Sequence, residues 1–360
     1  MQVRPAAPHR APDVLYHDYG YRSGINATMR RHLGDLAREI ETVMTLREGD
    51  NVIDIGANDG TLLLAYRTAG LRRIGFEPSN VRPDLADHPI LYVPTVFRPA
   101  EFHTRFPGRR ARVVTTIAMF YDIDDPVEFC RGISDVLTDD GVWVLEMSCL
   151  GAMLEHNTFD TICHEHLGYY SLRTLRHAVE AGGFEFYELA SNDANGGSVR
   201  CYLKKREHGK PIPSANRLRI EQALRDEEEK GYHEHSCYGQ FRRNVEQVRR
   251  ELRQLLDDIR RRGERVYGYG ASTKGNVLLQ YCGIGPADLI AIADRNPAKM
   301  GRLTLGTNIR ICSEEEMREA RPEFLLVLPW HFLNEFCERE RALRATGTRF
   351  IVPFDRVHIV

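Results

Sequence analysis

The chain has 360 residues, of which 42% are hydrophobic and 28% charged, and its formal net charge is −2. This balance is ordinary for a globular protein of more than one domain, and it does not favour a nucleic-acid or membrane partner. No apolar run approaches the ~20 residues of a membrane span, and the N-terminal stretch lacks the apolar core of a signal peptide. The eight cysteines form no C-x-x-C pair, so we expect reduced thiols, a cytoplasmic location and no metal site.

Residues 1–30 are expected to form a leader rich in Pro and Ala, followed by a polar and aromatic loop that contains Tyr19 and Tyr21. Two interpretations of this loop are open: a packed surface loop, or a lid that reaches over a pocket. A helix is expected after the loop, because Leu33 and Leu36 begin an apolar pattern with helical spacing.

Residues 51–77 have the pattern of a strand, a Gly-rich turn, a helix and a second strand. Gly56 and Gly60 flank the turn, where the backbone allows close approach of a ligand and helix amides point outward. Glu77 ends the second strand, a position from which a carboxylate accepts hydrogen bonds from ribose hydroxyls. With a third strand at residues 111–119, this half is expected to bind a cofactor that contains adenosine.

The turn departs from the dinucleotide pattern G-x-G-x-x-G, because Asn58 stands in place of the second glycine. It looks like motif I of class I S-adenosylmethionine methyltransferases, in which the turn holds the methionine half of the cofactor. The resemblance therefore implies S-adenosylmethionine, and the alternative is a doubly wound domain that has lost its cofactor. The candidate cofactor-binding residues are Asp54, Gly56, Asn58, Gly60, Glu77, Pro78 and Met119.

Ionisable and aromatic side chains are densest in the segment FDTICHEHLGYY, residues 159–170, between an expected strand and an expected helix. Loops at such positions carry the chemistry of many α/β enzymes. In an extended loop, alternation would direct His164 and His166 to one side and Glu165 to the other. The alternative is a solvated polar loop.

Three acidic residues follow the third expected strand. Asp124 and Asp125 precede a proline and a helix, where acidic residues are usually caps. Asp122 leaves the end of the strand, next to the expected cofactor crevice, and is a candidate for the active site. A hairpin is expected to close this domain near residue 205.

Residues 206–262 are expected to form a charged helical connector with one buried stripe that includes Leu255. A second His-Glu-His run in it, at 233–235, is expected to be solvated surface. A new α/β unit begins at residue 263, and its Gly-rich turn does not match the NAD-binding pattern. The turn amides and Lys274 suit an anion such as a phosphate, and the alternative is a purely structural helix on a sheet.

Together these segments resemble the sugar C-methyltransferases of deoxysugar and antibiotic biosynthesis, which methylate C-3 of a nucleotide-linked 4-keto-6-deoxyhexose. DIGANDGTLL, FDTICHEHLGYYS, NGGSVRCYL, GYGASTKGNVLLQYCG and VLPWHF occur in the family's order and extend over nearly the whole chain. The resemblance implies an α/β fold with a class I methyltransferase Rossmann-like domain at residues 31–205. It also implies a second Rossmann-like domain at residues 263–360 that binds a nucleotide-diphosphate sugar.

The resemblance assigns roles to matching positions. His166 corresponds to the family's proposed catalytic base, and Glu165 would hold the substrate or orient the base. The candidate catalytic residues are His166, Glu165, His164, Asp122 and Tyr170. The candidate substrate-binding residues are Tyr21, Asn195, Arg200, Ser272, Lys274, Asn276 and His331.

Three features depart from the family's pattern. The chain lacks the four-cysteine zinc domain with which the family usually begins, Cys163 replaces the usual tyrosine of the motif, and Asp122 stands where a histidine is common. The sugar, its nucleotide (dTDP or GDP) and the methylated carbon stay open at this point. A monomer and a homodimer are equally compatible with the sequence.

The expected reaction begins when His166 removes the proton beside the ketone, since an imidazole titrates near the working pH. A neighbouring His164 or Tyr170 would stabilise the negative enediolate, whose carbon then attacks the methyl group. Two alternatives stay open: an O- or N-methyltransferase that acts on a nucleotide sugar, and a nucleotide-sugar-binding protein without turnover.

Overall fold

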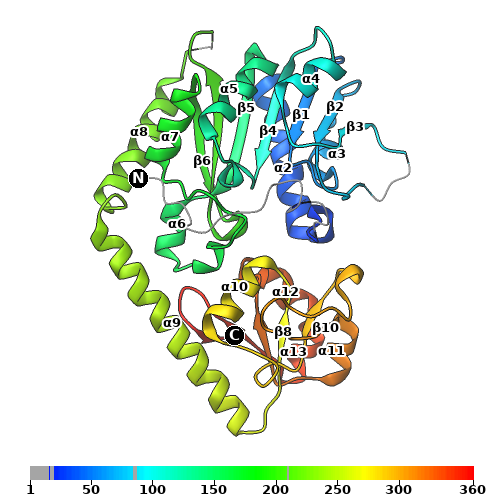
Figure 1. Cartoon of the computed structure of the whole chain (residues 1–360), viewed down its shortest axis with the longest axis vertical. Coiled ribbons are helices and arrows are strands. Elements are labelled where there is room, and N and C mark those ends of the chain that lie inside the picture. The colour runs from blue at the N-terminus through cyan, green and yellow to red at the C-terminus, as the bar shows by residue number, and fades with distance from the viewer. Residues whose placement is uncertain (1–15, 17–19, 84–86, 209–210) are drawn as a thin grey trace. The chain divides into compact units, whose positions relative to one another are not determined.

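The computed structural model describes residue 16 and residues 20–83, 87–208 and 211–360, and these form two compact units (Figure 1). Unit 1 comprises the described chain up to Leu150 and then His164–Gly231, whereas unit 2 comprises Gly151–Cys163 and Tyr232–Val360. The chain therefore enters unit 2 briefly before it returns to complete unit 1. The expected leader and Tyr19 lie outside the described residues.

Unit 1 is built on a seven-stranded sheet with the order β3-β2-β1-β4-β5-β7-β6. Its strands are β1 (Asn51–Ile55), β2 (Arg72–Phe76), β3 (Ile90–Val93), β4 (Ala111–Ile117), β5 (Leu137–Ser148), β6 (Phe184–Asn192) and β7 (Ser198–Lys205). Strands β1 to β5 run parallel, and β7 is antiparallel to both β5 and β6. The hairpin that closes the sheet has the predicted position.

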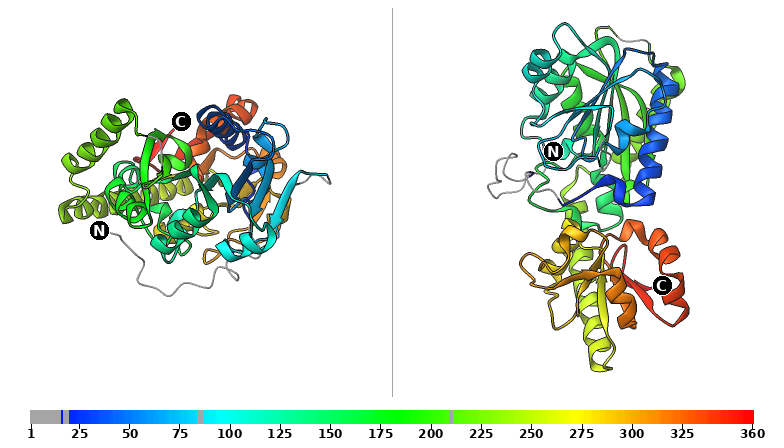
Figure 2. Two further views of the ribbon diagram at one scale, coloured as in Figure 1. Left: turned by 90° about the horizontal axis from the view of Figure 1, so that it is seen from above. Right: turned by 90° about the vertical axis from the view of Figure 1, so that its right-hand side faces the viewer.

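Helices cover both faces of this sheet, with α2 on one face and α4 and α5 on the other (Figure 2). The helices of unit 1 are η1 (Ser23–Ile25), α2 (Ala27–Met44), α3 (Thr61–Ala65), α4 (Pro99–Arg105), η2 (Phe120–Asp122), α5 (Pro126–Val136), α7 (Leu172–Ala181), η4 (Ala194–Gly196) and α8 (Ser214–Glu229). Helix α2 begins earlier than the sequence pattern indicated, because Met29 already contributes to its buried face. Asp125 caps α5 through the Glu128 amide, as predicted.

Strand β3 was not predicted, so the strand that we numbered third is β4. Strand β3 has only four residues, and Leu91 in it is 49% exposed, so it carries little of the apolar pattern that marks a buried strand. The core between sheet and helices centres on Trp143, whose Nε1 donates to Thr116 Oγ1 at 2.9 Å. The ring of Trp143 packs 5.1 Å from Phe184 and 5.8 Å from Phe120. Fully buried aromatic side chains of this kind contribute about 1.5–3 kcal/mol each.

Unit 2 is built on a six-stranded sheet with the order β10-β9-β8-β11-β12-β13. Its strands are β8 (Val266–Tyr269), β9 (Ile292–Asp294), β10 (Ile311–Ser313), β11 (Phe324–Val327), β12 (Arg349–Val352) and β13 (His358–Ile359). All pairs are parallel except β12 with β13. The sequence did not indicate β10 and β13, which are three and two residues long.

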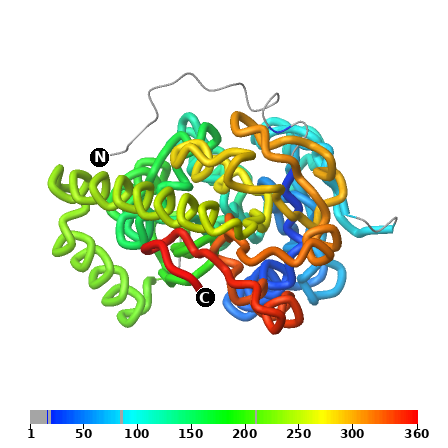
Figure 3. Tube along the Cα trace, turned by 90° about the horizontal axis from the view of Figure 1, so that it is seen from below, coloured from blue at the N-terminus to red at the C-terminus, as the bar shows by residue number. Residues whose placement is uncertain are grey.

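The helices of unit 2 include the long α9, which runs as one continuous rod (Figure 3). They are η3 (Phe159–Thr161), α9 (His235–Arg261), α10 (Thr273–Cys282), η5 (Pro297–Lys299), α11 (Glu314–Ala320), η6 (Trp330–Phe332), α12 (Leu333–Arg339) and α13 (Arg341–Ala345), while α6 (Leu150–Glu155) begins at the end of unit 1. The buried stripe of α9 contains Leu256 rather than Leu255, which packs only partly. The second His-Glu-His run is exposed, as predicted.

In each sheet the strands that follow the first one in sequence lie on opposite sides of it. Strands β2 and β4 flank β1, and β9 and β11 flank β8. The loop after β1 therefore leads away from the loop after β4, and the loop after β8 leads away from the loop after β11. A crevice opens between the two loops at the carboxyl edge of each sheet, where α/β proteins bind ligands. Among the described residues, no helix is long and apolar enough to cross a membrane.

Candidate functional site

The turn after β1 has the backbone conformation that its sequence predicts. Gly56 and Gly60 have φ of 77° and 76°, and Asn58 between them has φ of 50°, a left-handed conformation that asparagine tolerates better than most residues. A Cβ at position 60 would lie 2.4 Å from Ile90 Cδ1 and 2.7 Å from the Tyr92 hydroxyl, so only glycine fits there. The turn thus brings its backbone to the carboxyl edge of β1 with no side chain in the way.

Glu77 holds the turn from the end of β2. Its Oε2 accepts the amide of Asn58 at 2.7 Å, and its Oε1 accepts the amide of Ser79 at 2.9 Å. A carboxylate offers about four acceptor positions, so two remain for hydroxyl donors of a ligand. Pro78, a cofactor candidate, lies between these two anchored residues.

Buried acidic groups gather around this turn. Asp54, at 4% exposure, accepts a hydrogen bond from Thr115 Oγ1 at 2.5 Å. Burial raises the pKa of Asp54 to about 7, although the Thr115 hydroxyl opposes the shift; the charge of Glu77 adds to it. A third buried acid, Asp59, lies within the turn itself. This set of acidic acceptors fits a ligand with a positive charge and hydroxyl groups, and S-adenosylmethionine carries both.

The segment before α2 is bonded directly to the turn. The Ser23 amide donates to Asn58 Oδ1 at 2.9 Å, the Asn58 side-chain amide donates to Tyr21 O at 3.0 Å, and the Gly24 amide donates to Asp59 Oδ2 at 2.8 Å. Tyr21 was a candidate from the sequence, whereas Ser23 and Gly24 were missed because their contacts span 35 positions of the chain. The described part of the N-terminal loop therefore packs over the cofactor turn.

The His-Glu-His loop lies against the exit of β4. The amides of Leu167 and Gly168 both donate to Tyr121 O, at 2.8 and 2.9 Å, and the ring of His166 lies 4.1 Å from the ring of Tyr121. The same exit loop reaches the cofactor turn, since a Cβ at Gly56 would lie 3.5 Å from Met119 Cγ. Residues far apart in sequence thus meet at one edge of the sheet, and His166 lies on the loop that borders it.

The predicted alternation of the three side chains is wrong. His164 and Glu165 form a turn rather than an extended segment, so the simple two-sided pattern does not apply. His164 is exposed to solvent, whereas Glu165 and His166 are partly buried.

Asp122 and Glu165 form a pair of partly desolvated carboxyl groups beside His166. Burial raises the pKa of Asp122 well above its usual value, and the charge of Glu165 adds to the rise, while a hydrogen bond from Tyr16 opposes it. Burial also raises the pKa of Glu165, against the influence of His164. Asp122 Oδ1 is buried and accepts no hydrogen bond from the described residues. Burial therefore favours the protonated form of both carboxyl groups.

Three other candidates of unit 1 have surroundings of their own. Tyr170 is 2% exposed, and its ring packs 5.4 Å from Phe120, a position that favours a packing role. Asn195 lies in the β6–β7 turn with φ of 54°. Arg200 is buried and donates to Glu146 Oε2 at 2.7 Å, so its charge is matched within the protein.

Glu146 links this arginine to α2. Burial would raise the pKa of Glu146, but His32 and Arg200 together hold it below its usual value. His32 Nε2 lies 2.5 Å from Glu146 Oε1, and Arg200 also donates to Glu39 at 2.6 Å. This network could not be predicted from the sequence, because its members come from a helix and two strands that only the fold brings together.

The substrate candidates of unit 2 meet at the carboxyl edge of its sheet. Ser272 caps α10 by accepting the Gly275 amide at 3.0 Å, and Lys274 and Asn276 lie in the first turns of that helix. His331 follows the neighbouring strand β11, and its Nδ1 is buried without a hydrogen bond to the described residues. The four predicted residues thus come from the start of α10 and from the segment after β11, which border the crevice of this sheet.

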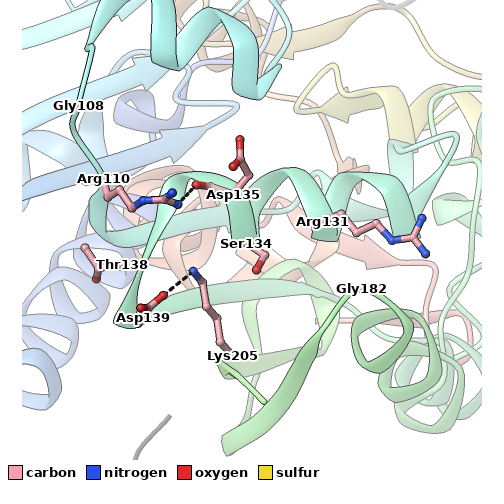
Figure 4. A pocket seen from close by; sticks show the side chains of 9 residues that line it. All are labelled: Gly108, Arg110, Arg131, Ser134, Asp135, Thr138, Asp139, Gly182 and Lys205. Carbon is pink, nitrogen blue, oxygen red and sulfur yellow. Dashed lines mark hydrogen bonds and ion pairs between the residues drawn. The ribbon is translucent and has the colours of Figure 1, made fainter. Parts of the chain in front are cut away.

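A separate hollow of about 850 Å³ in unit 1 lies at the opposite, amino edge of its sheet (Figure 4). Lys205 lines it but donates to Leu137 O at 2.8 Å and to Asp139 at 3.2 Å. Helices α5 and α7 both end beside it, and their carbonyl ends oppose an anionic ligand. This hollow therefore lacks the chemistry found at the carboxyl edge, and we do not assign the function to it.

Known proteins resemble this chain over nearly its full length. Residues 25–189 match a family described as a methyltransferase domain, and residues 193–354 match one described as the C-methyltransferase C-terminal domain. C-methyltransferase NovU from Streptomyces niveus is 31% identical over 354 residues, which cover 97% of this chain and 83% of NovU.

Solved structures resemble about half of the chain. Mitomycin 7-O-methyltransferase MmcR covers 50% of this chain and 54% of its own, with 15% identity and a TM-score of 0.37. The calicheamicin-biosynthesis methyltransferase CalO1, with S-adenosylhomocysteine bound, covers 49% and 54%, with 13% identity and a TM-score of 0.37.

The expected fold class, a class I methyltransferase Rossmann-like domain followed by a second α/β domain, is confirmed, as is the cofactor S-adenosylmethionine. The chain belongs to the C-methyltransferase family that includes NovU, and it is an S-adenosylmethionine-dependent methyltransferase.

Proposed function

We propose that the protein methylates the carbon next to the ketone of a nucleotide-linked 4-keto-deoxysugar, at C-3. The observation that carries this proposal is the place of His166, on a loop whose backbone is bonded to Tyr121 at the exit of β4. That exit also packs on the cofactor turn through Met119. Similarity to NovU, a C-methyltransferase, supports a carbon acceptor and a role in antibiotic biosynthesis.

The residues of the turn after β1 would hold the cofactor. Glu77 would accept the ribose hydroxyls, the turn from Gly56 to Gly60 would lie along the methionine half, and Asp54 and Asp59 would face its positive end. When bound, S-adenosylmethionine supplies a methyl group on a sulfonium, which is already activated for attack by a carbon nucleophile. The residues of the protein must generate that nucleophile from the sugar by removing a proton.

His166 would remove the proton beside the ketone. A hydrogen next to a carbonyl is weakly acidic, and an imidazole is the side chain best suited to accept such a proton near neutral pH. The ring of Tyr121, 4.1 Å away, limits how the imidazole can turn. The electron pair left on the sugar carbon would then form the new carbon–carbon bond as the methyl–sulfur bond breaks and leaves S-adenosylhomocysteine, and the proton would stay on His166.

The carboxyl pair Asp122 and Glu165 would stabilise the enediolate. Because burial raises the pKa of both groups, the protonated form of each is more favoured than in an exposed carboxyl group. A protonated carboxyl group in a desolvated site donates a strong hydrogen bond to a developing oxyanion. We assign this role to Asp122, because its Oδ1 is buried and makes no hydrogen bond to the described residues.

The crevice of unit 2 would bind the nucleotide diphosphate. Helix α10 presents its N-terminus there, and Lys274 lies in its first turn. Both features attract phosphate oxygens. His331, from the loop after β11, would add a hydrogen bond from a neutral imidazole, because burial holds its pKa well below the usual value.

Carbon-13 NMR of the product tests the proposal. Transfer from methyl-labelled S-adenosylmethionine to a dTDP- or GDP-linked 4-keto-6-deoxyhexose should give a methyl carbon coupled to a sugar carbon. A methyl carbon bonded to oxygen or nitrogen would instead establish the O- or N-methyltransferase alternative. Binding of the sugar without any labelled product, under conditions in which S-adenosylmethionine binds, would establish the non-catalytic alternative.

Solvent-deuterium exchange tests the first step separately. The wild-type enzyme should incorporate deuterium beside the ketone when S-adenosylhomocysteine replaces the methyl donor, since proton removal does not require the methyl group. Absence of exchange, with methyl transfer intact, would contradict a discrete enediolate.

A further inference from the structure

Asp160 is a buried acid that the reaction scheme does not use. It lies in η3, is 1% exposed, and belongs to unit 2 although only six positions separate it from His166. Its Oδ2 accepts the indole N–H of Trp330 at 3.3 Å. Its Oδ1 is buried and accepts no hydrogen bond from the described residues. A buried carboxylate oxygen without a donor is costly, so it calls for an explanation.

Asp160 lies in η3, which packs against α10, and the start of α10 borders the crevice in which we place the substrate diphosphate. Burial raises the pKa of Asp160 to about 6, and the charge of Lys274 is the main influence that opposes the rise. Burial likewise lowers the pKa of Lys274, while Asp160 and then Cys163 act in the opposite direction. His331 also faces Lys274, and its Nδ1 is a second buried polar atom without a described partner. The charge of Lys274, at the start of α10, thus acts on both buried groups, and the backbone amides of Asp160 and Thr161 also help to offset the burial of Asp160.

The charge of Asp160 is not needed to hold η3 in place. Phe159, the residue before it, is 3% exposed and belongs to the hydrophobic core of unit 2. Its ring packs 4.9 Å from Tyr281 and 5.4 Å from Phe354. Apolar packing therefore accounts for the position of η3, and the presence of a buried carboxylate at position 160 needs a different explanation.

We propose, resting on the function proposed above, that Asp160 is a substrate-positioning residue that pairs with Lys274 in the ligand-free protein and yields it to the substrate's diphosphate. A diphosphate at the start of α10 needs Lys274 as its cation. The diphosphate would bring negative charge next to Asp160, and like charges in a desolvated crevice repel strongly. Asp160 must therefore take up a proton when the anion binds.

Competition between Asp160 and the diphosphate for Lys274 would also affect the His-Glu-His loop. The chain passes from unit 2 to unit 1 between Cys163 and His164, directly after η3. The six positions from Asp160 to His166 span at most about 20 Å of chain, whatever the arrangement of the units. Phe159 would stay in the core of unit 2, so release of Asp160 from Lys274 would loosen only the residues after Asp160, which lead into the His-Glu-His loop. In this way substrate binding in unit 2 would prepare the base in unit 1.

Calorimetric titration of the full-length protein with dTDP-glucose and GDP-mannose tests this proposal. The diphosphate of these probes has no titratable proton between pH 5.5 and 7.5, so a pH dependence reports the protein. For the wild type we expect affinity to fall as pH rises through this range, with proton uptake on binding near pH 6.5. For Asp160→Asn we expect roughly 10-fold tighter binding at pH 7.5, no proton uptake and a flat pH profile.

Two further variants serve as controls. Asp355→Asn removes an exposed carboxylate of the same unit, which pairs with His156, and should leave affinity and proton uptake unchanged. Lys274→Met should weaken binding at least about 10-fold, since it removes the proposed cation. If Asp160→Asn does not fold, the proposal is tested by proton uptake in the wild type alone. Binding of the probe by the wild type without proton uptake overturns the proposal.

The remaining outcomes separate this proposal from the proposed function. Equal or weaker binding by Asp160→Asn, when the wild type binds, overturns the competition and leaves C-methylation untouched. Tighter binding by Asp160→Asn together with an O-methylated product supports the competition and overturns C-methylation. No binding of either probe by the wild type overturns both the competition and the assignment of a nucleotide sugar to unit 2.

Hydrogen exchange measures the link to the catalytic loop. The amides of residues 161–167 should change their exchange rate when dTDP-glucose binds the wild type. In ligand-free Asp160→Asn they should already exchange at the ligand-bound rate. If the probe binds with no change in this segment, the link along the chain is wrong.

Discussion

Both units fasten the turn after their first strand to an acid at the end of their second. In unit 1, Glu77 accepts the amide of Asn58 at 2.7 Å; in unit 2, Asp294 accepts the amide of Ala271 at 2.8 Å. Each carboxylate also accepts the amide two positions after it, at 2.9 and 2.8 Å. The backbone solution is therefore the same, although the two turns have different sequences.

The charges around the two turns differ. In unit 1, the buried acids Asp54 and Asp59 join Glu77. In unit 2, Lys299 donates to Ala271 O at 2.7 Å and lies 3.4 Å from Asp294, so the acid beside the turn is paired. Under the function proposed above, the fold supplies a similar crevice in both units, and these few side chains would decide whether a cationic cofactor or an anionic substrate fits it. The predictions below test this division of labour.

The largest expected effect is a loss of kcat on substitution of His166 in unit 1, and substitution of His331 in unit 2 is expected to change KM instead. His166→Asn should lower kcat by about 10²- to 10⁴-fold, because it removes the proposed general base. His331→Asn should act mainly on KM for the nucleotide sugar, by about 10-fold, because a buried neutral imidazole contributes a hydrogen bond to binding. Steady-state kinetics of the two variants measures both. A His166→Asn variant with wild-type kcat would remove the base from the mechanism.

Gly60 in unit 1 and Gly283 in unit 2 provide a second contrast. Both glycines have positive φ, 76° and 65°. A Cβ at Gly60 would lie 2.4 Å from Ile90 Cδ1, whereas a Cβ at Gly283 would have no heavy atom of the described residues within 4 Å beyond its chain neighbours. Gly60→Ala should cost about 2–4 kcal/mol, because overpacking adds to backbone strain, and Gly283→Ala about 1 kcal/mol. Calorimetric melting of each variant measures the costs. Equal losses would show that the turn after β1 relaxes easily.

Much of the cofactor turn could be predicted from the sequence, because its determinants are local. Strand β1 has the predicted ends, and Gly56, Asn58 and Glu77 lie at the turn as expected. Contacts that depend on long-range packing could not be predicted. The Ser23 amide reaches Asn58 across 35 positions, and the short, half-exposed β3 lacks a strong apolar pattern.

The His-Glu-His loop shows the same limit. Its place after β5 and before α7 followed from the order of the elements. The direction of its side chains did not, because alternation holds only in extended backbone, and His164 and Glu165 form a turn. Nor could the sequence show that the chain changes unit between Cys163 and His164, since the packing of Phe159 in unit 2 decides that.

Glu77 and Asp294 give the third contrast, in binding rather than stability. Glu77→Gln should weaken S-adenosylmethionine binding by about 10- to 100-fold, because the amide group of glutamine meets the Asn58 or Ser79 N–H and offers fewer acceptors to the ribose. Asp294→Asn is the matched variant and should leave that affinity unchanged. Calorimetric titration with the cofactor checks both. A loss of cofactor affinity in Asp294→Asn would contradict the assignment of one ligand to each unit.

Removal of Lys299 should have the smallest effect and would make the turn of unit 2 electrostatically similar to that of unit 1. The side chains of Lys299 and Asp294 are 26% and 12% exposed, so their attraction is only partly screened, and Lys299→Met should destabilise unit 2 by about 1 kcal/mol. Arg310→Met, which breaks a pair with Glu316 in which both side chains are 46% exposed, should cost less than about 0.5 kcal/mol. Melting in low and high salt measures both, and high salt should reduce the cost at Arg310 more strongly. If the two variants lose the same stability, the amide hydrogen bonds of Asp294 alone hold the turn, and the charge contrast between the units concerns ligand choice only.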